Sequence, residues 1–395
     1  MQVYCLTTLD ELKPYADVWD RLAVGSPFRG WTWLSSWWHN YGPQNGDDSR
    51  THLAAICVFD DADTLIGVAP LYLDCSAVWG RVLRPLGDGE VCSDYLSVLC
   101  HPTDEDSITE ALADYLVANA MSDNAEALHW DLLDLDGIDA EDHAVSALVG
   151  RLAALHCDFH EQAGPNCWRL PLPTDWECYV TSLSRNLRRD VRQLERNYWD
   201  SGRVALHTVE RLDELQPAMD ILIDLHSRRR ASLGEKSCFA SKRFHAFFRE
   251  VMPKLLRQGR LQFQWLELDG RAAAAECVLL DGGISYMYQG GIDPAAAEHQ
   301  PGKLIQLRMM RQMIKGGVLA FDFLRGDEPY KARFGARPRP SVRLQLVPPR
   351  PLARIRHHVW LAGRNVKEWM KRETNGEGSK TGRQEQSRLR LRTSH

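Results

Sequence analysis

The sequence predicts a mixed α/β (α+β) protein of two similar domains in tandem, each a mixed sheet flanked by helices. The order strand, strand, strand, helix, strand occurs in both halves. Residues 65–73 correspond in position to 271–280, and Trp130-Asp131-Leu132 corresponds to Phe321-Asp322-Phe323. The strands flanking each crossover helix are expected to be parallel, because such connections within one sheet are right-handed and parallel.

Length and composition agree with two domains. The chain has 395 residues and is 44% hydrophobic, enough to bury more than one core. Pro171 and Pro173 stand in a polar junction, so we expect a first domain over 1–172 and a second over 173–349.

The charge distribution argues against nucleic acid as a partner. Residues 350–395 contain 12 Lys/Arg and 4 Asp/Glu, whereas the first 349 contain 36 Lys/Arg and 49 Asp/Glu. Nucleic-acid affinity depends on Lys and Arg neutralising phosphates, so an acidic body binds them poorly.

The N-terminal residues have neither the basic region nor the apolar stretch of a signal peptide, and no apolar run is long enough to span a membrane. The ten cysteines show no Cys-x-x-Cys pair and no zinc-site spacing. We therefore expect a cytoplasmic protein with reduced thiols and no metal.

In the first half, the patterns predict a helix over 10–22 and then a tryptophan-rich segment over 27–41. An antiparallel meander follows over 52–59, 65–73, 82–86 and 95–99. A helix over 103–120, a strand over 128–135 and a helix over 140–156 complete this half. Trp31, Trp33, Trp37 and Trp38 can form a ligand-stacking wall, but large aromatic side chains are foremost core residues, and we favour core packing.

In the second half, the patterns predict helices over 184–198, 212–232 and 241–257 and strands over 261–268, 271–280 and 284–290. Asp269-Gly270 and Gly282-Gly283 are hairpin turns between these strands. A helix begins at Pro301 and ends at Gly316-Gly317, and an apolar strand through Phe321 and Phe323 follows.

This last strand runs into Gly326-Asp327-Glu328-Pro329-Tyr330-Lys331. A strand ending Asp-Phe that leads into Gly-Asp-x-x-Tyr-Lys resembles the C-terminal signature of GNAT-like acyltransferases of the cellulose-biosynthesis CelD and BioF type, which are related to the tandem-GNAT FemAB aminoacyltransferases. The resemblance covers about the first 345 residues. It implies two tandem GNAT-like domains and transfer of an acyl group from an acyl thioester of coenzyme A.

Comparison of the two halves places the acyl donor that the resemblance implies in the second half. The free amides at a helix N-terminus can hold its pyrophosphate, and the helix opening Gln300-Pro301-Gly302-Lys303-Leu304 offers a small Gly and a Lys. In the first half the matching helix opens with Asp104, Glu105 and Asp106, which would repel a pyrophosphate. The first domain is then a degenerate copy that shapes the acceptor site.

Acyl transfer to an amine calls for a carboxylate base and a Tyr or Lys acid. The candidates are Asp322 at the strand end, with Asp327, Tyr330 and Lys331 beyond it; Asp327 can also be a turn cap and Lys331 a surface charge. Glu276 stands in a run of alanines, where a carboxylate is costly to bury. It is either a general base with a raised pKa or the partner of an arginine such as Arg308.

Two further groups are candidates for substrate binding. Arg188 and Arg189 lie on the basic helix 184–198 and either hold an anionic substrate or form a solvated face. Tyr286 and Tyr288 alternate on one strand face and either line the cleft or pack in the core.

The C-terminal region, 350–373, is expected to contain a helix over 352–370. Residues 374–395 have few large apolar groups and should be a disordered basic tail. Such a tail allows at most peripheral membrane contact, and a solubilising role is favoured.

The expected function is N-acyl transfer from acyl-CoA to an amine of a small molecule or saccharide, an amino sugar in polysaccharide or cell-envelope biosynthesis. The amino-sugar acceptor follows from the family resemblance alone. The alternatives are a FemAB-like transferase that uses aminoacyl-tRNA and a non-catalytic accessory protein.

Overall fold

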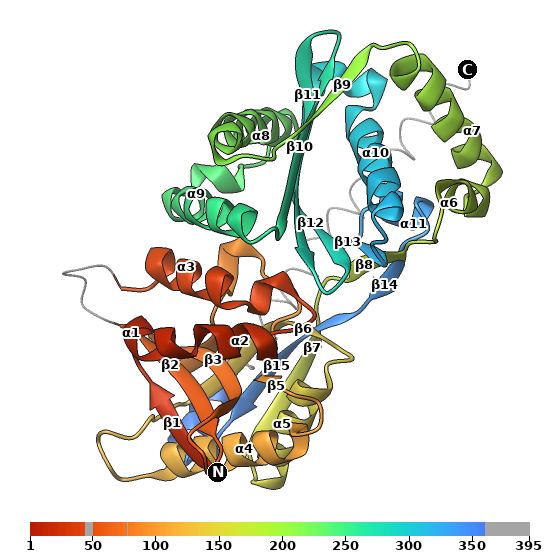
Figure 1. The fold of residues 1–395 in the computed structure, drawn as a ribbon. Helices are drawn as coiled ribbons and strands as arrows, with labels where there is room; N and C mark the ends of the chain where they lie inside the picture. The colour runs from red at the N-terminus through yellow and green to blue at the C-terminus, as the bar shows by residue number, and fades with distance from the viewer. Residues whose placement is uncertain (44–49, 77, 360–395) are drawn as a thin grey trace, which may run out of the picture.

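The computed structural model describes residues 1–43, 50–76 and 78–359, whose strands form two sheets (Figure 1). The first sheet has the order β1-β2-β3-β4-β6-β15-β7, with β5 paired to β3. Its strands are β1 (Gln2–Leu6), β2 (Thr51–Phe59), β3 (Leu65–Ser76), β4 (Gly80–Pro85), β5 (Leu99–Cys100), β6 (Leu132–Asp139), β7 (Asp158–Ala163) and β15 (Ser341–Val347).

The second sheet has the order β9-β10-β11-β12-β13-β8-β14. Its strands are β8 (Cys167–Pro171), β9 (Val204–Thr208), β10 (Leu261–Leu268), β11 (Arg271–Asp281), β12 (Ile284–Ile292), β13 (Ala320–Arg325) and β14 (Arg337–Arg339). In both sheets one pair is parallel, β4 with β6 and β12 with β13, and the other pairs in these two orders are antiparallel. The expected parallel crossovers are therefore present in both halves.

The two sheets exchange one strand each. β8 follows β7 of the first sheet in the chain but pairs with β13 and β14 of the second. β15 follows β14 of the second sheet but inserts between β6 and β7 of the first. The sheets thus divide the chain differently from the boundary expected between 172 and 173, because a strand's local sequence pattern does not say which sheet it joins.

Helices cover both faces of each sheet (Figure 1). In the first half, α2 and α3 lie on the side toward the second sheet, and α4 and α5 lie on the far side. In the second half, α8 and α9 pack on one face, while α10 and the short α6 lie on the other. The helices are α1 (Leu9–Leu12), α2 (Ala16–Leu22), α3 (Trp31–Tyr41), α4 (Glu105–Met121), α5 (His143–Ala154), α6 (Trp176–Ser182), α7 (Arg185–Leu194), α8 (Leu212–Ser232), α9 (Lys242–Arg257), α10 (Pro301–Lys315) and α11 (Pro329–Arg333).

The hairpins of the second sheet form where their turn residues predict them. Asp269 and Gly270 have φ of +50° and +80°, and Gly282 and Gly283 have φ of +54° and +76°. Positive φ at both central residues is the type I′ turn, whose twist matches that of antiparallel strands. These turns set the register of β10, β11 and β12.

Several elements differ from the sequence-based expectation. Of the strand expected over 95–99, only Leu99 lies in a strand, and it forms the short β5 with Cys100. Tyr95 instead adopts φ +63°, and its amide bonds to the Gly137 carbonyl. β6 begins at Leu132 rather than at 128, because the side chains before it are committed elsewhere. The Trp130 indole donates to the Leu116 carbonyl, and the Asp131 carboxylate accepts from the Arg81 amide.

Two other boundaries changed. The α-helical part of the basic helix ends at Leu194, and a π-helical turn over Glu195–Trp199 follows it. The chain is helical over 351–359; the rest of the expected C-terminal helix and the basic tail lie outside the described residues.

The largest hydrophobic core joins the two halves. It contains the inward side chains of the first sheet together with α8 and α9, and α3 packs directly against α9. Trp33 is fully buried in edge-to-face contact with Phe247 and Tyr288. Trp37 is buried, and Trp31 and Trp38 pack against the core, so the tryptophans are core residues as favoured. A second core lies between α10 and the other face of the second sheet.

Among the described residues no helix is both long and apolar enough to cross a membrane. All ten cysteines lie in the described part of the chain and are unpaired thiols. The same part contains no group of three or more His, Cys, Asp or Glu side chains arranged to hold a metal ion.

The exchanged strand β15 should be essential to the first sheet. Leu346 is fully buried and pairs with Leu133 and Phe159 on either side. Leu346→Ala should therefore lower the free energy of unfolding by about 3 kcal/mol, the usual cost of a large cavity in a core, as measured by urea denaturation. Leu352→Ala, at an exposed leucine a few residues on, is the matched control. Equal unfolding midpoints for the two variants would show that β15 does not hold the sheet together.

Candidate functional site

The parallel strands β12 and β13 separate along their length. They pair only from Ile284 with Ala320 to Tyr286 with Asp322. Just beyond this point each strand has a bulge against its other neighbour. The pairing of β12 with β11 is interrupted between Cys277 and Val278 of β11, and the pairing of β13 with β8 is interrupted between Asp322 and Arg325 of β13. Because a bulge bends and twists its strand, two bulges at one level hold the strands apart, and the two strands form no ladder beyond Tyr286 and Asp322.

A cavity of about 500 Å³ lies at this separation, and we call it the site cavity. Strand residues from both sides line it, with α8, α10, α11 and the loop before β5 around them. The lining includes Cys92, Asp94, His226, Arg229, Arg230, Glu276, Met287, Tyr288, Gln289, Gly290, Gly302, Lys303, Gln306, Arg325, Glu328, Tyr330 and Lys331.

Glu276 is the unusual acid of this cavity. Its side chain is buried, and one oxygen accepts from the Gln306 amide at 3.2 Å while the other, Oε2, has no hydrogen-bond partner in the described residues. Burial raises the pKa of Glu276 to about 8. A Cβ on Gly290 would lie 2.6 Å from Oε2, so a glycine is required beside the carboxyl. Its partner is Gln306; Arg308 instead lies over the Trp199 ring.

The start of α10 lies at the same cavity. Gln300 enters the helix with φ +54°, Pro301 has no amide hydrogen, and the first helical bond runs from the Leu304 amide to the Gln300 carbonyl. The amides of Gly302 and Lys303 therefore remain free to bind an anion. The Lys303 ammonium contacts Asp190 at 2.5 Å, and Leu304 is buried in the core rather than in the cavity.

A second cavity of about 840 Å³ adjoins the first and shares Lys303, Tyr330 and Phe334 with it; we call it the outer cavity. Arg189 of α7 lines it, together with Arg333 of α11. Arg188 is occupied differently, since its guanidinium donates to the Thr181 and Leu183 carbonyls at the end of α6. Of the two predicted arginines, only Arg189 faces a cavity.

Lys331 is buried and is therefore not the surface charge that its sequence position allowed. Its ammonium donates to the carbonyls of Leu324, Arg325 and Gly326 at 2.9–3.1 Å and contacts Glu328 at 2.8 Å. All three protons are used. The ammonium thus fixes the loop after β13, in which Leu324 has φ +55° and Gly326 φ +115°.

Tyr330 and Asp327 have different surroundings. Tyr330 lines both cavities, and burial followed by the charge of Glu276 raises the pKa of its phenol, which stays protonated at neutral pH. Asp327 is exposed and outside the site cavity. Its carboxylate accepts from the Asn166 amide and the Trp168 indole at 2.9 and 3.0 Å, and these bonds lower its pKa. It ties the loop to the segment entering β8.

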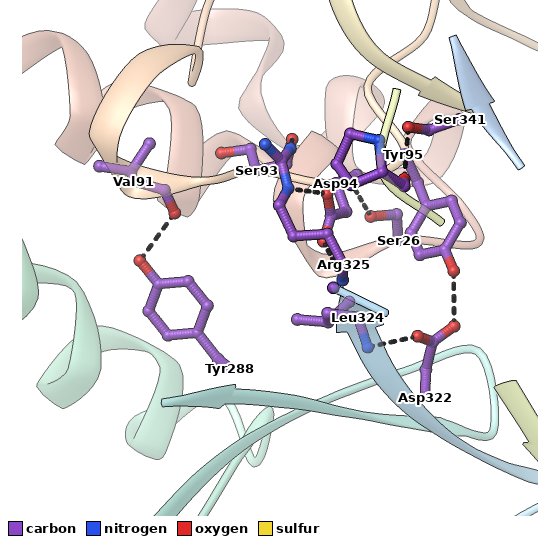
Figure 2. Close-up of polar contacts among 12 residues, drawn as sticks. Ser26, Val91, Ser93, Asp94, Tyr95, Tyr288, Asp322, Leu324, Arg325 and Ser341 are labelled. Atoms are coloured by element: carbon purple, nitrogen blue, oxygen red, sulfur yellow. Dashed lines mark hydrogen bonds and ion pairs between the residues drawn. The ribbon is translucent and has the colours of Figure 1, made fainter. Parts of the chain in front are cut away.

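Asp322 also lies outside the cavity, at the contact between the two halves (Figure 2). Its carboxylate is fully buried and accepts from the Tyr95 hydroxyl, the Arg169 guanidinium and the Leu324 amide at 2.7, 2.7 and 2.8 Å. Each of its oxygens already has a donor. The structure therefore gives Asp322 a bridging position and not one from which it reaches a substrate in the site cavity.

The tyrosines of β12 point toward the first half. The Tyr286 hydroxyl donates to the Gly25 carbonyl at 2.8 Å. The Tyr288 hydroxyl donates to the Val91 carbonyl at 3.0 Å, as Figure 2 shows. Both rings belong to the shared core, and only Tyr288 also touches the site cavity.

Sequence reasoning missed several cavity residues. Asp94 comes from the loop before β5 and binds the Arg325 side chain at 2.5 Å (Figure 2), so the first half supplies part of the wall. No local pattern reveals a contact between residues 231 positions apart. His226, Arg229 and Arg230 come from the end of α8, where the run Arg228-Arg229-Arg230 was the visible sign.

The equivalent place in the first half is filled. β4 and β6 pair only at Val82 with Leu132 and Leu83 with Leu133, but no bulge interrupts the pairing of β4 with β3. Ser97 and Val98 lie beside Pro85 there, and the space left is about 20 Å³ with an almost wholly apolar lining. The first half therefore has the strand arrangement without the cavity.

Asp322 and Asp327 differ enough to be tested as a pair. Asp322→Ala should lower the free energy of unfolding by about 3 kcal/mol, because it leaves the Arg169 guanidinium beside the core without its counter-charge. Asp327→Ala removes an exposed carboxylate and should change it much less. Urea denaturation of the two variants measures the difference, and equal effects would contradict the bridging position of Asp322.

Comparison with known proteins agrees with this geometry. Residues 185–332 match the family described as the acetyltransferase (GNAT) domain. The matched region runs from α7 to α11 and contains the separated strands and the residues that line the site cavity, apart from Cys92, Asp94 and Phe334. No curated protein sequence matches the chain.

Solved structures share the fold over most of the chain. The structure of FemX superposes with a TM-score of 0.61 at 12% identity, covering 90% of this chain and 99% of that one. The C-terminal domain of a putative lysylphosphatidylglycerol synthetase from Agrobacterium fabrum superposes with 0.50 at 10% identity, covering 87% and 93%. A conserved protein of unknown function from Bacteroides thetaiotaomicron gives 0.51 at 11%, covering 85% and 97%. The chain thus contains a region similar to the acetyltransferase (GNAT) domain and shares its fold with these structures.

Proposed function

We propose that this protein transfers an acyl group from acyl-CoA to an amine in the site cavity, with Glu276 as the general base. The observation that carries the proposal is the buried Glu276 carboxyl on β11, which has one unpartnered oxygen and lines the site cavity. Acyl-CoA supplies an activated thioester carbonyl.

The described residues fit such a donor. The free amides of Gly302 and Lys303 lie at a helix start, where the dipole favours a pyrophosphate. Beyond Tyr286, β12 has no strand partner on its β13 side, so this edge offers backbone groups for an extended amide-containing arm. Arg189 and Arg333 at the outer cavity add positive charge for further phosphate.

Glu276 accepts the proton that the amine loses as its nitrogen forms a bond to the acyl carbon. Tyr330 gives its phenolic proton to the departing thiolate as the carbon–sulfur bond breaks. Glu276 then releases its proton to solvent, and Tyr330 regains one from solvent. The products are an amide and the free thiol of coenzyme A, so atoms and protons balance. Lys331 keeps the loop after β13 in place and acts as a positioning residue.

The proposal extends to an amino sugar of polysaccharide or cell-envelope precursors as the acceptor. Its support is the resemblance of the Asp322 to Lys331 segment to CelD-like and BioF-like acyltransferases. A cytoplasmic location belongs to the proposal because acyl-CoA is a cytoplasmic metabolite.

An aminoacyl-tRNA donor is the second candidate, since the fold is similar to that of FemX. Assays of the purified chain with acyl-CoA thioesters and with aminoacyl-tRNA separate the two donors. A ligand that binds specifically must stabilise the native state. If neither a CoA thioester nor aminoacyl-tRNA raises the thermal stability of the chain, the results would favour a non-catalytic accessory protein.

Glu276→Gln should lower kcat/KM by at least about 100-fold, the usual contribution of a general base, without changing the affinity for CoA. Because the base must be ionised, kcat/KM of the natural protein should rise tenfold per pH unit and level off above about pH 8. Glu267→Gln, in the adjacent strand β10 and away from the cavity, is the control. A variant Glu276→Gln with full activity and the same pH profile would exclude this role.

The same carboxyl should make stability depend on pH. Its pKa is higher in the folded protein, about 8, than the ordinary 4.5. The folded state therefore holds the proton more tightly, and stability falls as pH rises from about 4.5 to 8, by at most about 1.4 kcal/mol per unit. Glu276→Gln should remove this slope in urea titrations across pH 5–8; an unchanged slope would mean that Glu276 is ionised throughout.

Gly302→Asp should weaken CoA binding at least tenfold relative to Gly302→Asn. Both side chains must displace Ile292, whose Cγ2 lies 3.2 Å from a Cβ at this position, but only Asp adds a charge that repels phosphate. Isothermal titration with CoA measures the ratio. Equal affinities for the two variants would place the phosphates elsewhere.

A further inference from the structure

Three consecutive arginines near the end of α8 have different surroundings. Arg228 contacts Asp224 and Asp293, both at 2.9 Å, and Arg230 contacts Glu235 at 2.6 Å. Arg229, between them, has no ion pair and no side-chain hydrogen bond within the described chain. Cations near a helix C-terminus are favoured by the dipole, and this applies equally to all three arginines. It does not explain why Arg229 alone among them is half-buried in a cavity wall without a counter-charge.

Arg229 is also the uncompensated cation of the site cavity. The other cations that line it are paired within the described residues: Arg325 with Asp94, Lys303 with Asp190, Lys331 with Glu328 and Arg230 with Glu235. His226 is neutral, since burial lowers its pKa to about 4. Glu276 is largely protonated at neutral pH. The cavity therefore has a net positive charge centred on Arg229.

This charge lies across the sheet from the proposed donor phosphates. α8 packs on the same face of the second sheet as α9, whereas α10, which begins with Gly302 and Lys303, packs on the opposite face. At the end of β12 the helices approach from two sides: a Cβ on Gly291 would lie 2.6 Å from the His226 amide, and Gly302 faces Ile292. Arg229 is thus on the side left for the acceptor.

We propose that the acceptor amine also bears an oxyanion, a phosphate or a carboxylate, and that Arg229 binds it. The inference rests on the proposed function and adds the acceptor's charge class. A planar guanidinium with free donors suits a phosphate or carboxylate, which it can bind through two parallel hydrogen bonds. The attacking nitrogen would then be held at Glu276 by an anchor on the opposite end of the molecule.

The test uses matched amines that differ in one anionic group: glucosamine and glucosamine 6-phosphate, ethanolamine and phosphoethanolamine, cadaverine and lysine. Each is titrated into the full chain saturated with CoA, and transfer from acetyl-CoA is followed by thiol release. At least one anionic member should bind ten times more tightly than its neutral partner. The phosphate and carboxylate pairs distinguish the two anions.

Four proteins are compared: the natural chain, Arg229→Gln, Arg229→Lys and Arg228→Gln. Arg229→Gln should reduce the anionic members to the affinity of their neutral partners, and Arg229→Lys should keep part of the difference. Arg228→Gln removes the same charge from the same helix outside the cavity and should keep all of it. The affinity for CoA should be equal in all four.

Two results would overturn the inference. If Arg229→Gln weakens CoA binding tenfold, Arg229 serves the donor; if no anionic member is preferred by the natural chain, Arg229 does not recognise an acceptor anion. Failure of CoA itself to bind would instead count against the proposed function, so the two failures are distinguishable.

Discussion

The buried carboxylate of Asp322 joins the parts on which the site depends. It accepts hydrogen bonds from its own strand, from Arg169 on the exchanged strand β8 and from Tyr95 in a loop of the first half. The bond to the Leu324 amide stabilises the left-handed residue that forms the bulge of β13. Without that bulge β13 would continue beside β12 and close the space that forms the site cavity. One side chain thus couples the contact between the halves to the opening between the strands.

The strand exchange also couples the two halves, through both sheets. Neither sheet is complete without a strand from the other half, and both exchanged strands bring an arginine to a buried aspartate: Arg169 to Asp322, and Arg343 to Asp134 at 2.6–2.7 Å. The shared core through α3 and α9 adds apolar contact. The two halves therefore form one cooperative structure, and the orientation of the cavity walls, one of which comes from the first half, is fixed by folding.

The sequence predicted what local patterns control. Period-two alternation and the Asp269-Gly270 and Gly282-Gly283 turns located the hairpins, and Pro301 located the start of α10, since these residues act through their own backbone angles. Glu276 stood out because an acid among alanines is energetically costly. The strand exchange was not predictable, because β15 has the same alternation in whichever sheet it pairs.

Burial separated the candidates within the Asp322 to Lys331 segment. Asp322 was expected at the strand end and Lys331 either as an acid or as a surface charge. Both are buried: Tyr95 and Arg169 bind Asp322, and three nearby backbone carbonyls bind Lys331. Asp327 alone stayed exposed. The sequence correctly singled out this segment. The structural positions of Asp322 and Asp327 depend on contacts with residues more than 150 positions away, which no local pattern reveals.

The loop between β4 and β5 fills a space in the first half and helps to form a cavity wall in the second. Its last residues, Ser97 and Val98, occupy the space between β4 and β6, while Cys92 and Asp94 a few positions earlier form part of the other cavity's wall. If the two halves descend from one duplicated ancestor, the loss of one binding site supplied the material that shapes the other. Removing Ser97 and Val98 from the first space would then disturb the loop that holds Cys92 and Asp94 in the wall of the site cavity. The difference between the two halves would therefore be hard to reverse.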